Sequence, residues 1–130
     1  MRRFLPIIAA LLLAASCNPK VDEEFLVSPD ICLQENGKMI LKYESTTCQM
    51  SSNPEKHRYR IMDDTMSRYY MVTLGEEPKS IGQKILGDLR WSTGVSVENY
   101  TGVEFTVEKL EGSQVWLWNS RRKIAVSIML

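Results

Sequence analysis

The chain has 130 residues, of which 44% are hydrophobic, and its 16 Lys and Arg residues balance its 16 Asp and Glu residues at a formal net charge of zero. This balance excludes the strongly basic footprint of a nucleic-acid-binding domain, so we expect no nucleic acid partner. The length fits a single domain, and the sequence contains no internal repeat.

The N-terminal residues have the three parts of an export signal. Arg2 and Arg3 give a positive start, an apolar run extends from Phe4 to Ala15, and the run ends in small residues. The run is shorter than the about 20 residues that a helix needs to span a bilayer. We therefore predict a signal peptide over residues 1–16. The alternative is a buried N-terminal helix.

Cys17 follows this run directly, after Ala14, Ala15 and Ser16. Small residues that end in a cysteine after an apolar run resemble the lipobox of bacterial lipoproteins, and the resemblance covers residues 1–17. The pattern departs from the usual one at Ala14, where that family commonly has Leu. The resemblance implies that the precursor is cut before Cys17 and that Cys17 is diacylated, which would hold the mature protein on a membrane.

After the cysteine, residues 17–27 are predicted to form a lipidated tether ahead of a single β domain over residues 28–130. The acidic run Asp22 to Glu24 resembles the signal that sends surface lipoproteins of the Bacteroidota to the outer face of the outer membrane. The alternative is a solvated charge run. We therefore expect an outer-membrane lipoprotein of the cell envelope. Removal of Arg2 and Arg3 with the signal leaves 14 Lys and Arg against 16 Asp and Glu, a mature charge of −2.

Cys32 and Cys48 remain once Cys17 is assigned to lipid. An even pair in an exported protein predicts a disulfide, which would stabilise the fold by ~3 kcal/mol on the chain-entropy model. The alternative is two free buried thiols. The only histidine is His57, and the cysteine spacing matches no zinc pattern, so we expect no metal and no other cofactor.

An alternation of apolar and polar residues with a period of two runs through the domain and predicts strands. These strands are expected at about 31–34, 38–43, 57–62 and 68–74, around Ile85, Leu89 and Trp91, and at 103–109, 115–118 and 123–130. Asn36-Gly37 is typical of a hairpin turn, and the last thirty residues predict a three-stranded meander. Gly87, inside a strand, is typical of a bulge that curls a sheet. We expect an all-β fold of six or seven antiparallel strands, as a small OB-like barrel in preference to a sandwich.

The sequence contains no recognisable catalytic arrangement. His57 lies in an alternating stretch with a charged outer face, and the acidic pairs Asp63-Asp64 and Glu76-Glu77 fall at predicted turns, where acids are ordinary. No Gly-rich phosphate loop is present. We therefore expect a protein that is not an enzyme.

Two features indicate binding or modification instead. Trp116 and Trp118 share one face of their strand, where they are candidates for a platform that stacks on a glycan or protein ligand, with core packing as the alternative. Thr65, within Asp64-Thr65-Met66, resembles the O-glycosylation acceptor of exported Bacteroidota proteins, and a plain turn is the alternative. The sequence thus predicts a binding or accessory module at the cell envelope. A structural subunit of a surface complex, or a small envelope inhibitor, is the other hypothesis.

Overall fold

The computed structural model describes residues 20–44, 49–63 and 67–130. The predicted signal peptide and Cys17 therefore lie outside the described residues, as do Cys48 and Thr65. The described part contains the short helix α2 (Glu23–Val27), the 3-10 turn η1 (Pro54–Lys56) and nine strands: β1 (Ile31–Glu35), β2 (Lys38–Tyr43), β3 (Gln49–Asn53), β4 (Arg58–Met62), β5 (Arg68–Leu74), β6 (Lys84–Thr93), β7 (Val97–Glu111), β8 (Gln114–Asn119) and β9 (Ile124–Met129). None of its helices is long and apolar enough to cross a membrane.

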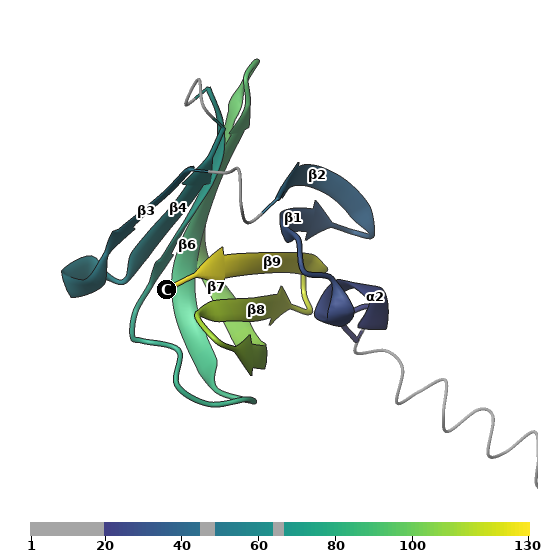
Figure 1. Cartoon of the computed structure of the whole chain (residues 1–130), viewed down its shortest axis with the longest axis vertical. Coiled ribbons are helices and arrows are strands. Elements are labelled where there is room, and N and C mark those ends of the chain that lie inside the picture. Colours follow the sequence, from purple (N-terminus) through teal and green to yellow (C-terminus); the bar gives the residue numbers. More distant parts are fainter. Residues whose placement is uncertain (1–19, 45–48, 64–66) are drawn as a thin grey trace, which may run out of the picture.

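All nine strands form one antiparallel sheet in the order β2-β1-β9-β8-β7-β6-β5-β4-β3. The sheet is a meander from β3 to β9, and the hairpin of β1 and β2 returns to lie beside β9. It curls into a half-barrel, with β3 and β4 on one side and β1 and β2 on the other (Figure 1), and the curl brings β2 against β5 and β4 against β9. The predicted all-β class is confirmed. The predicted count of six or seven strands is wrong, and the sheet keeps two outer strands, β2 and β3.

The hairpin turns form where the sequence places residues that tolerate a positive φ. Asn36 has φ 53° and Gly37 has φ 77°, as the tight turn between β1 and β2 requires. The predicted three-stranded meander at the C-terminus is confirmed as β7, β8 and β9. Its central strand, β8, is buried on both faces, as the uninterrupted apolar run at 115–118 predicts.

Alternate residues of the strands fill the concave side of the half-barrel. This concave core contains Tyr70, Phe105 and Leu117 among many aliphatic side chains. Two tyrosine hydroxyls connect the halves of the sheet across it. The hydroxyl of Tyr43 donates to the carbonyl oxygen of Arg68 at 2.6 Å, and that of Tyr70 donates to the carbonyl oxygen of Ser127 at 2.5 Å.

A second, smaller cluster lies on the opposite face of β1, β8 and β9, under α2. We call it the helix-covered cluster, and it consists of Phe25, Cys32, Trp116, Trp118 and Ala125, with Val21 and Leu26 packed against it. Phe25 is only 2% exposed. The predicted tether at 17–27 therefore needs correction, because its second half packs on the sheet and the domain begins near Val21.

Gly87 lies at an irregularity in the sheet, as its position inside a strand predicts. The register between β6 and β7 shifts between Gly87 and Leu89. A β-carbon at Gly87 would lie 2.6 Å from the carbonyl oxygen of Thr73, so no larger residue fits without movement of the backbone. The bulge and this close approach together increase the curl of the sheet.

Strand β3 was not predicted from the sequence. All five of its residues, Gln49 to Asn53, are exposed, and they carry no apolar alternation. It forms because β4 offers it a hydrogen-bonding edge, with Ser51 opposite Arg60. The strand therefore depends on tertiary pairing and not on its own side chains.

Candidate functional site

The two tryptophans that are candidates for a ligand platform lie inside the molecule. Trp116 is 2% exposed and Trp118 is 9% exposed. The ammonium group of Lys109 lies 4.6 Å from the ring centroid of Trp116 and donates to the carbonyl oxygen of Leu26 at 2.7 Å, which ties α2 down over the indole. Neither ring has the exposed face that stacking requires, so the structure supports core packing and corrects the platform hypothesis.

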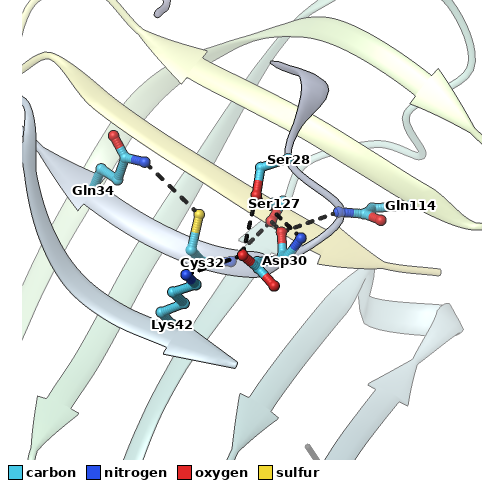
Figure 2. Close-up of polar contacts among 7 residues, drawn as sticks. All are labelled: Ser28, Asp30, Cys32, Gln34, Lys42, Gln114 and Ser127. Atoms are coloured by element: carbon cyan, nitrogen blue, oxygen red, sulfur yellow. Dashed lines mark hydrogen bonds and ion pairs between the residues drawn. The ribbon is translucent and has the colours of Figure 1, made fainter. Parts of the chain in front are cut away.

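A group of polar residues surrounds the start of β1, as Figure 2 shows. Ser127 is fully buried, and its hydroxyl accepts the N–H of Cys32 at 2.9 Å and donates to the carbonyl oxygen of Asp30 at 3.3 Å. The side-chain amide of Gln114 donates to the same carbonyl at 3.3 Å, and Lys42 pairs with the Asp30 carboxylate at 3.2 Å. β1 pairs with β9 only over Leu33–Glu35, so these side chains replace the missing ladder bonds. This group therefore has a structural role, because it holds the start of β1 against β8 and β9.

Cys32, at the centre of that group, is a free buried cysteine. Burial raises the pKa of its thiol to about 11, with smaller opposing effects from hydrogen bonds to Gln34 and Ser127. The thiol therefore stays protonated near neutral pH, and a protonated thiol is a poor nucleophile. The structure gives no support to the predicted bond with Cys48, which lies outside the described residues.

The described residues contain no group of three or more metal-ligating side chains. His57 lies at the end of η1 with φ 49°, in the left-handed region, and not in a strand as predicted. The predicted lipidation at Cys17 and O-glycosylation at Thr65 fall outside the described residues and stay predictions.

Three arginines gather on the convex side of β4, β5 and β6. The register places Arg60 opposite Met71 and Met71 opposite Arg90, so the three side chains share one face of the sheet. Arg58 lies two residues before Arg60 and therefore on the same face. Together with Ser51 and Asn53 of β3, these residues line a depression of about 420 Å³. We call this surface the arginine face.

Among the described residues, the guanidinium groups of the arginine face form no ion pair with an acid. The ion pairs in the described part of the chain all use lysines. Arg60 contacts the ring of Tyr69, with its guanidinium carbon 5.2 Å from the centroid. The Nε–H of Arg58 is buried and has no hydrogen-bond partner among the described residues. Asp88 lies on the same face, in the row of Arg58 and Thr73, but its carboxylate accepts the N–H of Gly102 at 3.1 Å.

A second cationic surface lies at the turn between β8 and β9. It combines Arg121, Arg122 and Lys123 with Lys38 of β2, and it also contains Glu35. The guanidinium carbon of Arg122 lies 4.1 Å from the centroid of the Tyr100 ring. The lining of this surface includes an acid, Glu35, whereas the lining of the depression at the arginine face includes none, so the second cationic surface is the weaker candidate for an anion.

Alternation around the arginines was visible in the sequence, because Arg58 and Arg60 flank an apolar position and Arg90 lies between Leu89 and Trp91. Their meeting on one face was not visible, since it depends on the register of three strands. The balanced total charge also hides a local excess of cations.

Comparison of the chain with protein-family models, with curated proteins and with solved structures finds no match.

Proposed function

We propose that this chain is a non-catalytic binding module of a cell-envelope lipoprotein and that its arginine face binds an anionic ligand. The observation that carries this proposal is the meeting of three guanidinium groups around one depression without an acidic partner among the described residues. Guanidinium groups present paired N–H donors that match carboxylate, sulfate and phosphate oxygens.

The buried Nε–H of Arg58 supports this proposal. An unpaired buried donor is destabilising by about 1–3 kcal/mol, and an acceptor from a ligand would remove that penalty. Met71 lies between Arg60 and Arg90 and gives the depression a small apolar floor. The arrangement therefore suits a ligand that carries several negative charges on a partly apolar framework.

The position of the arginine face fits an anchor at Cys17. The described chain begins at Lys20, just before α2, and three residues reach at most about 10 Å. α2 packs on β1, β8 and β9, whereas β3 and β4 lie at the far edge of the sheet (Figure 1). A lipid on Cys17 would thus hold the helix side near the membrane and turn the arginine face away from it.

Binding of polyglutamate and of a sulfated glycan such as heparin tests the proposal. We expect saturable binding to the wild-type protein that weakens with salt, because exposed charges are screened. Each exposed charge pair contributes up to about 1 kcal/mol, so replacing Arg58, Arg60 and Arg90 by Gln together should weaken binding more than tenfold.

The matched control replaces Lys38, Arg121 and Lys123 of the second cationic surface by Gln, which removes the same number of charges. It should keep the wild-type affinity to within about threefold. Equal losses in both triple variants would show that net charge and not the arginine face drives binding, and binding that survives the loss of all three arginines would refute the proposed site.

A further inference from the structure

The outer strand β3 is an open edge of the sheet. It lies last in the strand order and pairs only with β4 among the described strands. In an antiparallel pair, about half of the N–H and C=O groups of the outer strand point away from its partner. All five residues of β3 are exposed, and Gln49 to Asn53 include no charged residue and no proline.

The other outer strand, β2, has protection that β3 lacks. It carries Lys38 and Lys42, and charged side chains on an edge oppose the addition of another strand. The pairing of β1 with β2 also contains an irregularity between Leu33 and Gln34, which bends that edge. Of the two edges, β3 is therefore the one open to a further strand.

The arginine face lies directly beside this open edge. Ser51 is opposite Arg60 and Asn53 is opposite Arg58, so each of these short β3 side chains lies between the open edge and a longer cationic side chain of β4. A strand added to β3 would lie two strand spacings, or about 10 Å, from β4. Extended arginine side chains can reach across Ser51 and Asn53 toward that position, and all four residues line the same depression.

We propose that an extended acidic segment of a partner protein adds to β3 as a tenth strand. This inference rests on the proposed anion-binding function and names the ligand class. Side chains of a strand alternate between faces, so the carboxylates would occupy alternate positions beside Arg58 and Arg60. The intervening side chains would lie beside Met50, which is 45% exposed at the rim of the concave core, so they should be apolar.

Charge disfavours a second copy of this chain as the occupant. Two copies paired edge to edge through β3 would bring two arginine faces together on one side of a continuous sheet. The arginines of both copies would reach toward the paired β3 strands from opposite sides and repel one another, and β3 contains no acid to offset them. An acidic partner has the opposite charge and the same backbone geometry.

The test uses the wild-type protein and a short capped peptide of alternating glutamate and valine. Fluorescence anisotropy of the labelled peptide measures its binding to the protein. A peptide of the same composition in scrambled order is the control. Two further peptides carry N-methyl groups, one on every glutamate nitrogen and the other on every valine nitrogen. In an added strand one of these sets of N–H groups faces β3 and the other faces solvent.

We expect the alternating peptide to bind at least about tenfold more tightly than the scrambled one, and one methylated peptide to lose at least about tenfold while the other keeps most of its affinity. Equal behaviour of the two methylated peptides, or no preference for the alternating order, would overturn strand addition while leaving anion binding intact. Failure of polyglutamate and heparin to bind would instead overturn the proposed function. A concentration-dependent dimer that the peptide does not dissociate would show that β3 is occupied by a second copy and would also overturn this inference.

Discussion

Trp116 shows how one side chain joins the helix to the sheet. It lies beneath Lys109, whose ammonium group bonds the end of α2, and it belongs to the same cluster as Phe25. The indole N–H has no hydrogen-bond partner among the described residues, so the stabilisation comes from burial and from the cation above the ring.

Replacing Trp116 by Ala should lower the free energy of unfolding by about 3–5 kcal/mol, because it leaves a cavity under α2. Chemical denaturation measures this loss. Val95→Ala is the control, since Val95 is 94% exposed and its truncation should have almost no effect. A Trp116→Ala protein as stable as the wild type would show that the indole is not part of a packed core.

Cys32 should react with iodoacetamide only after unfolding. Burial raises its pKa to about 11, so near pH 8 only about one thiol in a thousand is ionised in the folded protein. We expect no labelling of the native protein, and labelling in denaturant without reductant, when the Cys32 peptide is followed by mass spectrometry. Protection in denaturant that ends only with reductant would show that Cys32 is in a disulfide.

Among the strands, Gly87 links the close approach of β5 and β6 to the curl of the sheet. Replacing Gly87 by Ala places a β-carbon against the carbonyl oxygen of Thr73, so we expect a loss of about 1–3 kcal/mol in the free energy of unfolding. Leu86→Ala in the same strand is the control, because Leu86 is 63% exposed. Equal stabilities of Gly87→Ala and wild type would argue that β5 and β6 do not approach so closely.

The sequence was sufficient for the elements whose own side chains alternate. Hairpins around Asn36-Gly37 and the meander from β7 to β9 follow from that pattern and from turn residues. β3 was not predicted, because its polar residues form a strand only by pairing with β4 in the folded sheet. The burial of Phe25 was not predicted, because the acids before it indicate a solvated tether. The arginine face was not predicted, because it depends on the register of three strands.

For the molecule as a whole, we propose a lipid anchor at Cys17 that turns the arginine face away from the membrane. Metabolic labelling with a fatty-acid analogue should mark the wild-type protein, and Cys17→Ala should abolish both the label and partitioning into detergent, because a diacylated cysteine is the predicted anchor. Ser16→Ala, which keeps a small residue before the cysteine, is the control and should still be labelled. A Cys17→Ala protein that still labels would show that Cys17 is not the site of acylation.

Anion binding at the arginine face can be observed directly by NMR, through the Nε–H resonances of the arginines during a titration with polyglutamate. We expect saturable shifts at Arg58, Arg60 and Arg90, with the largest at Arg58, whose Nε–H is buried without a partner among the described residues. Arg121 and Arg122 should shift little. Shifts confined to Arg121 and Arg122, or spread evenly over all the arginines, would contradict anion binding at the arginine face.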